Sequence, residues 1–273
     1  NFTWTLGGSA DFFEDDLSNR DQLNPKLGVT WNPFPATTLR AAAFRVLKRS
    51  LLSDQTLEPT QVAGFNQFFD DANGTDAWRY GIALDQKFTR DLYAGLEISK
   101  RDLTVPYLAF QFLDDGTFAS HKADADWEER VSRAYLYWTP VKWLAVGAEY
   151  RYEHLKRDEE DPGEELFTDI RTHRLPLSIK VCHPSGLSAG LVATYIDQEF
   201  EFIAPDFGGA ESGSDNFWIV DGAISYRFPG RYGMFTIEGK NLFDKKFRFQ
   251  DTDPANPTVY PERVLFAKLT FAL

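Results

Sequence analysis

Apolar and polar side chains alternate residue by residue along many segments of the chain. In residues 78–88, for example, Ile82 and Leu84 occupy positions of one parity and Asp85 and Lys87 positions of the other. Because successive side chains of a β-strand point to opposite faces, a period of two predicts a strand with one apolar and one polar face.

The same criterion, applied to the whole chain, predicts twelve strands. They span residues 2–12, 26–31, 39–47, 78–88, 92–101, 133–138, 144–153, 177–181, 187–195, 218–228, 233–242 and 264–273. Residues 61–69 and 103–112 could each form an extra hairpin arm, so we expect between about ten and fourteen strands.

Short and long connections alternate between these strands. Short turns lie at residues 32–36, 89–91, 139–142, 183–186 and 229–232, and most contain Pro or Gly. Long polar segments lie at residues 13–25, 48–77, 102–130, 155–171, 196–216 and 243–262. A soluble β-sandwich has no reason for this asymmetry, because both of its ends face the same solvent. The asymmetry therefore predicts an all-β fold, a transmembrane antiparallel up-and-down β-barrel with short periplasmic turns and long extracellular loops.

Composition agrees with a barrel better than with membrane helices. Aromatic residues make up 15% of the 273 residues, yet the mean hydropathy is only -0.38. No apolar run approaches the roughly 18 residues that a membrane helix needs. In a barrel, only alternate residues face lipid, so the chain can remain polar on average. Several aromatic residues lie beside the predicted short turns, where an interfacial girdle is expected: Trp31, Phe34, Phe88, Trp138, Trp143, Phe228 and Tyr232.

Charge and motifs exclude several classes of function. The formal net charge of -12 argues against a nucleic-acid partner, because binding to phosphates needs a basic surface. Cys182 is the only cysteine, so the chain cannot form an intrachain disulfide. No Gly-x-Ser-x-Gly pattern occurs, and we expect no enzymatic activity. We also expect no cofactor and no metal ion: the acidic residues 158–165 lack the ligand spacing of a calcium loop, and His154 and His173 share no short motif.

The polar parity of the strands carries charges of both signs. We interpret these residues as candidates for the lining of the barrel lumen, where neighbouring strands would pair them across the sheet. They are Arg79, Asp85, Lys87, Glu97, Arg101, Arg133, Glu149, Arg151, Glu153, Lys180, Asp221, Arg227, Glu238, Lys240 and Lys268. They could guide a polar solute, or they could simply brace a polar interior.

Aromatic side chains also occur in the predicted external loops. Exposed aromatic groups beside acidic residues often mark recognition surfaces. The candidates are Phe65, Phe68, Phe69, Tyr107, Phe110, Phe112, Phe200 and Phe202. In the alternative interpretation, these side chains pack the loops against one another and fill the mouth of the barrel.

Near the C-terminus, residues 239–247 read Gly-Lys-Asn-Leu-Phe-Asp-Lys-Lys-Phe. This segment resembles the penultimate-strand signature of TonB-dependent outer-membrane receptors. Residues 23–33 resemble the family's strand that enters a periplasmic proline turn, and residues 57–59 resemble a loop element of the same family. The last strand, with an aromatic at Phe271, resembles the outer-membrane targeting signal.

The resemblance implies the C-terminal barrel region of such a receptor, a location in the bacterial outer membrane, and the function of a transporter or receptor for a solute. Twelve strands are fewer than the 22 of large outer-membrane transporters, and the sequence shows no plug-like segment or TonB box. We therefore interpret residues 1–273 as one outer-membrane β-barrel domain that is either part of a larger barrel, which we favour, or a small barrel closed by pairing of its first and last strands.

Other functions remain open at this point. The chain could form a plugless porin, an exopolysaccharide-export barrel that follows a helical-repeat region, or a membrane-anchoring subunit of an envelope complex. The expected partners are outer-membrane lipid and lipopolysaccharide and the barrel-assembly machinery. TonB or other envelope proteins would be partners if an N-terminal region precedes the barrel.

The predicted topology can be tested on intact cells. Residues 158–165 should be accessible to an added protease or to an impermeant label, because they belong to a long external loop. The turn at residues 183–186 should be protected. Labelling of the turn alone would reverse the orientation.

Overall fold

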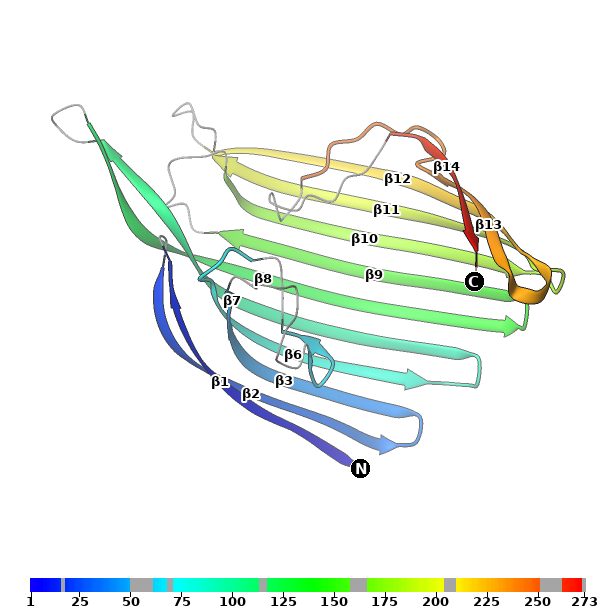
Figure 1. Ribbon diagram of the computed structural model, residues 1–273, viewed down its shortest axis with the longest axis horizontal. Helices are drawn as coiled ribbons and strands as arrows, with labels where there is room; N and C mark the ends of the chain where they lie inside the picture. Colours follow the sequence, from blue (N-terminus) through cyan, green and yellow to red (C-terminus); the bar gives the residue numbers. More distant parts are fainter. Residues whose placement is uncertain are drawn as a thin grey trace.

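Twelve antiparallel strands form one curved sheet, in which each strand pairs with its neighbour along the chain (Figure 1). The computed structural model describes residues 1–15, 18–49, 61–67, 71–112, 117–157, 166–203, 210–250 and 262–271. The strands of the sheet are β1 (Phe2–Glu14), β2 (Asn19–Phe34), β3 (Thr37–Leu47), β6 (Asp76–Lys87), β7 (Leu92–Phe112), β8 (Phe118–Val141), β9 (Leu144–Arg157), β10 (Leu166–Cys182), β11 (Leu187–Ile203), β12 (Ala210–Arg227), β13 (Gly233–Lys240) and β14 (Val264–Phe271).

The number of strands in the sheet and their up-and-down order confirm the predicted fold class. A single turn of 3₁₀ helix, η1 (Pro229–Arg231), lies in the turn before β13. Residues 61–66 do form a hairpin, β4 (Gln61–Val62) and β5 (Phe65–Asn66), but this hairpin pairs only with itself. Residues 103–112 are not a separate arm, because they continue β7.

Most of the predicted long loops are wrong in extent. Residues 102–130 were expected as a loop, yet β7 runs on to Phe112 and β8 begins at Phe118. The described residues of the segments 13–25, 155–171 and 196–216 are likewise largely strand. A membrane crossing takes only about 9–11 residues of a tilted strand, whereas β8 has 24 residues. Beyond the bilayer both faces of a strand meet water, so the sequence loses the period of two by which a strand is recognised.

One face of the sheet is a continuous apolar band, which we call the outer face. Cross-strand neighbours there include Ile82 with Ile98 and Leu84 with Leu96. The exposed side chains of this face include Phe2, Trp4, Leu6, Leu27, Trp31, Ile82, Leu84, Leu96, Ile98, Leu136, Trp138, Leu177, Ile179, Leu191, Trp218, Ile224, Ile237 and Leu265. Large apolar side chains exposed over so many adjacent strands indicate a surface that lies in lipid.

The short turns gather at one end of the sheet, on the right in Figure 1. Six of the seven predicted girdle aromatics are exposed there, and Phe228 is half-buried. Among the described residues no helix is long and apolar enough to cross a membrane.

β1 and β14 are the two ends of the ladder, and each pairs with one neighbour in the described part of the chain. Figure 1 shows them at opposite edges of the sheet. Backbone amides in lipid need hydrogen-bond partners. Both edges must therefore be paired wherever they lie in the membrane.

The assignment of faces predicts the effect of inserting a charge. Leu96→Arg or Leu191→Arg should destabilise the folded protein by roughly 2–4 kcal/mol near mid-membrane. The same substitution at Ser188 or Ser225, on the opposite face, should cost much less. Refolding into lipid bilayers at graded denaturant concentrations measures the difference, and similar losses on both faces would contradict the assignment.

Ser99 is not a suitable control in that experiment, although its parity is correct. Its side chain is buried and its hydroxyl accepts a hydrogen bond from Arg79. An arginine at this position would have no room.

Candidate functional site: the charged inner face

The face opposite the apolar band, the inner face, carries all fifteen charged residues singled out in the sequence. Strand alternation and register place them there. Glu97, for example, lies opposite Arg133, and Arg133 lies opposite Arg151. Their role in lining a lumen remains a prediction, but the structure does bring several of them together.

A row of ionic contacts crosses the inner face from β3 to β8. Arg40 on β3 donates to Asp85 on β6 (Nε to Oδ2, 2.9 Å) and to Glu97 on β7 (Nη2 to Oε2, 3.4 Å). The hydroxyl of Tyr135 on β8 donates to the other oxygen of Asp85. The Tyr135 ring fits over Gly95, where a Cβ atom would stand 2.5 Å from the ring.

The row continues from β8 to β9 through a bidentate ion pair. Arg133 donates from Nε and Nη2 to the two carboxylate oxygens of Glu149, at 2.9 and 2.8 Å. Tyr137 donates its hydroxyl to Glu149 at 3.1 Å. We call this continuous set the charged belt: Arg40, Asp85, Glu97, Arg133, Tyr135, Tyr137 and Glu149.

A second cluster lies closer to the long connections. Arg101 pairs with Glu129 on β8 and with Asp71, which lies between β5 and β6. The side chain of Arg101 is only 6% exposed. Arg79 lies directly opposite Arg101 in the sheet and donates to Ser99. Two buried guanidinium groups side by side are tolerable here because carboxylates and hydrogen-bond acceptors surround them.

The remaining candidates are more dispersed. Arg151 pairs with Glu153, and Lys240 contacts both Asp221 and Glu238. The Lys87 ammonium lies 5.3 Å from the centre of the Tyr93 ring. Among the described residues, four of the candidate cations make no ion pair: Lys87, Lys180, Arg227 and Lys268.

The aromatic candidates do not form one external surface. Phe65 is 1% exposed and packs against the inner face, so the expectation of an exposed loop aromatic is wrong at this position. Phe200 and Phe202 lie on β11 and pack with Phe167 of β10. Tyr107, Phe110 and Phe112 belong to β7, whereas Phe68 and Phe69 lie outside the described residues.

Sequence patterns missed five members of these two clusters: Arg40, Asp71, Glu129, Tyr135 and Tyr137. Arg40 lies in a segment whose alternation is unclear, because alanines occupy both parities around it. Tyr135 and Tyr137 have the polar parity of their strand, but parity alone does not identify them as hydrogen-bond donors. Glu129 fell within a predicted loop. If residues 102–130 are assigned to extensions of the neighbouring strands, Glu129 lies directly opposite Arg101.

No metal centre is formed by the described residues. His154 contacts Asp169 (Nε2 to Oδ2, 3.0 Å), and His173 is hydrogen-bonded to Tyr150. These two pairs lie on the outer face, and the ring of Tyr152 lies next to both imidazole rings. The acidic segment at residues 158–165 lies outside the described part of the chain.

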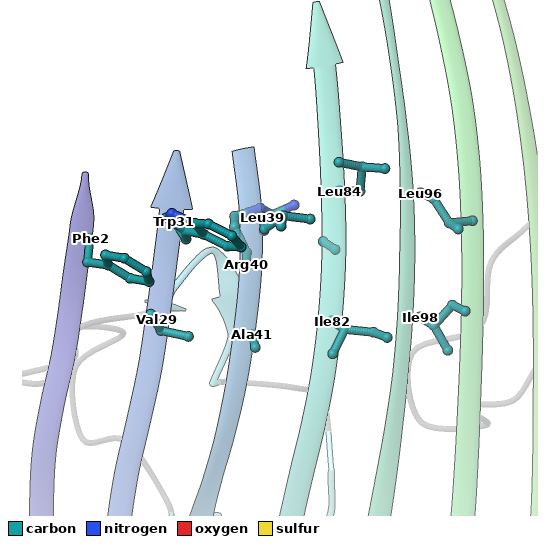
Figure 2. A pocket seen from close by; sticks show the side chains of 11 residues that line it. Phe2, Val29, Trp31, Leu39, Arg40, Ala41, Ile82, Leu84, Leu96 and Ile98 are labelled. Carbon is teal, nitrogen blue, oxygen red and sulfur yellow. The ribbon is translucent and has the colours of Figure 1, made fainter. Parts of the chain in front are cut away.

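An apolar pocket lies on the outer face, not in the charged interior (Figure 2). It has a volume of about 380 Å³, and the small side chain of Ala41 is among the residues that line it. Figure 2 shows larger side chains around it, among them Trp31, Leu39, Ile82 and Ile98. Because this pocket opens toward the presumed lipid, it is not the place where a polar solute would bind.

No family model matches the chain, and no curated protein matches it by sequence. Solved structures do resemble it. The FrpB iron transporter from Neisseria meningitidis (F3-3 variant) aligns with a TM-score of 0.62 and 15% identity over 92% of this chain. The siderophore receptor PiuA from Acinetobacter baumannii aligns over 88% of this chain at 12% identity (TM-score 0.46), and the Pseudomonas putida toluene transporter TodX over 100% at 13% (TM-score 0.37).

The likeness to FrpB shows that the chain has the fold of a bacterial outer-membrane β-barrel. Barrels of this kind lie in the bacterial outer membrane. The chain spans 39% of the length of FrpB, 44% of PiuA and 78% of TodX.

Two arginines of the inner face should differ sharply in their effect on stability. Arg101→Ala leaves the carboxylates of Asp71 and Glu129 without their shared partner and should cost about 3–5 kcal/mol. Arg227→Ala, on the same face but exposed, should cost less than about 0.5 kcal/mol. Equilibrium unfolding of both variants in lipid would measure this, and equal losses would show that the Arg101 cluster is not a stabilising unit.

Proposed function

We propose that the chain forms the wall of an outer-membrane transporter or receptor that passes a polar solute along its inner face. The observation that carries this proposal is the charged belt, a set of paired cations, carboxylates and tyrosine hydroxyls that runs across five adjacent strands opposite the apolar band. A row of hydrogen-bonding groups can replace part of the hydration shell of a solute that moves past it.

A TonB-dependent mode of action is the finer form of this proposal. The receptor-like segment at residues 239–247 and the likeness of the fold to FrpB support it. In this form, residues 1–273 are one part of a larger barrel, and coupling to TonB would take place through a region outside this sequence. A plugless porin, an exopolysaccharide-export barrel and a membrane-anchoring subunit are the alternatives.

We propose no enzymatic role. The carboxylates of the belt are engaged by arginine or tyrosine side chains, as Glu149 is by Arg133 and Tyr137. Such groups are suited to holding a shape and a charge pattern. They are poorly placed to act as a general base, which must be free to accept a proton.

The outer face supports two lipid partners. The apolar band would contact acyl chains, and the pocket over Ala41 would accept part of one. Above the band, Lys100, Arg130 and Arg171 lie on the same face among acidic residues. These cations would meet the anionic groups of lipopolysaccharide. We also propose that the barrel-assembly machinery inserts the chain, because the last strand resembles the outer-membrane targeting signal.

Charge selectivity tests this function. In the full-length protein reconstituted into planar bilayers, Arg133→Gln should shift selectivity toward cations, because it removes one positive charge from the path. Arg130→Gln is the matched control: it lies on the same strand but on the outer face, and it should leave selectivity unchanged. If no ion or small sugar passes, the protein is not a transporter. If Arg133→Gln and Arg130→Gln have the same ion selectivity, solute does not move along the inner face.

A further inference from the structure

The hairpin of β4 and β5 packs against the inner face of the sheet. Val62 and Phe65 are each 1% exposed, and they form one apolar cluster with Ala42 and Phe44 of β3 and Ala83 of β6. The side chains at the two ends of the hairpin are polar: Gln61 and Asn66 are exposed, and the Gln61 amide donates to Asn66 at 3.2 Å. The hairpin therefore has an apolar side against the wall and a polar side away from it.

The wall has a seat for this hairpin, made by two glycines on different strands. A Cβ atom added at Gly28 of β2 would stand 2.9 Å from Val62 and from Ala63, and one added at Gly81 of β6 would stand 2.4 Å from the Phe65 ring. Non-bonded carbon atoms do not approach this closely. Any other residue at either position would push the hairpin off the wall.

Two arginines hold the hairpin from either side. Arg40 donates to the carbonyl oxygen of Ala63, and Arg79 donates to that of Asn66, each at 3.3 Å. Both guanidinium groups also lie over the Phe65 ring, at 5.3 and 5.8 Å from its centre. Cation–π contacts of this kind strengthen when they are shielded from water.

The turn of the hairpin is fixed by its backbone. Ala63 and Gly64 both have positive φ angles, 47° and 87°. Two successive positive φ angles define the tight turn that matches the twist of a two-stranded hairpin. The hairpin thus has a defined conformation as well as a defined seat.

The hairpin also stands at one end of the charged belt. The guanidinium of Arg40, which bonds to Ala63, is the same group that binds Asp85 and Glu97. The polar edge of the hairpin and the ionic row therefore lie at the same level of the wall. A solute that moves along the inner face would meet both together.

We propose that residues 61–66 are a resident constriction of the conduit, docked on the wall at the level of the charged belt. The constriction narrows the path and lines it with the amides of Gln61 and Asn66. It selects small hydrophilic solutes, which can exchange water for these amides and for the groups of the belt, and it excludes bulky apolar ones. This inference rests on the proposed function in transport.

Docking can be tested without any transport assay. In the full-length protein with Cys182→Ser, a thiol reagent should modify Val62→Cys at least about tenfold more slowly than Gln61→Cys, a ratio that the burial of a single apolar side chain can provide. Adding Gly81→Leu should remove the difference, because the leucine displaces Phe65. Equal rates at both positions in the parent would overturn the inference.

The constriction itself is tested by conductance and by uptake of small hydrophilic sugars. Gly81→Leu should raise both several-fold. Gly190→Leu is the matched control, because it adds the same side chain to the inner face at a position where the nearest described atom, the carbonyl oxygen of Ile179, would lie 3.8 Å from the added Cβ atom. Phe65→Ala changes no residue of the wall and should also raise conductance and sugar uptake. Agreement between Phe65→Ala and Gly81→Leu would show that the increase does not come from a misfolded wall.

The outcomes separate this inference from the proposed function. Parent protein that passes solute at the same rate as hairpin-displaced variants would leave transport intact and overturn the constriction. A parent that passes solute slowly and variants that pass it several-fold faster would support it. Protein that passes nothing in any form, with the hairpin shown to be displaced, would overturn both.

Discussion

The backbone of every strand in this sheet must find its hydrogen bonds on the neighbouring strand, because lipid offers none. This requirement fixes the architecture before any side chain is considered. Once strands are paired in register, alternate side chains are sorted to two faces, and the apolar residues of all twelve strands meet in one band. The row formed by Leu39, Leu84 and Leu96 across β3, β6 and β7 illustrates the result.

The inner face solves a different problem. A polar wall cannot be filled like an oily core, and an isolated charge beside it would be costly. The chain pairs most charges across strands, with Arg40 and Arg133 each engaging carboxylates of a neighbouring strand. Glycines provide the space for these contacts. Gly95 admits the ring of Tyr135, and Gly28 and Gly81 admit the hairpin. Small residues of the wall are therefore as important to the interior as the charged ones.

The fold could be predicted from sequence because the membrane imposes a regular pattern on each crossing. Ile82 and Asp85, for example, reveal their faces by parity alone. The clusters on the inner face could not be predicted, because their members are far apart in the chain: Arg101 and Asp71 are separated by 30 residues, and Arg40 and Glu97 by 57. The burial of Phe65 against the inner face could not be predicted from sequence either. From sequence, residues 61–69 could be a loop or an extra hairpin arm, and the three-dimensional positions of Gly28 and Gly81 explain why the hairpin folds inward.

The outward row of charges on β7 has a consequence for how the protein sits in its bilayer. Leu96 and Ile98 belong to the apolar band, but the next two residues of the same face are Lys100 and Asp102, bound to each other at 2.8 Å and joined to Glu128 through Lys100. Since two residues of a strand span about 7 Å, a slight sinking of the barrel would drag this ionic row into hydrocarbon. The row therefore limits how deeply the barrel can sit in the bilayer, and the parts of β7 and β8 beyond it extend outside the lipid.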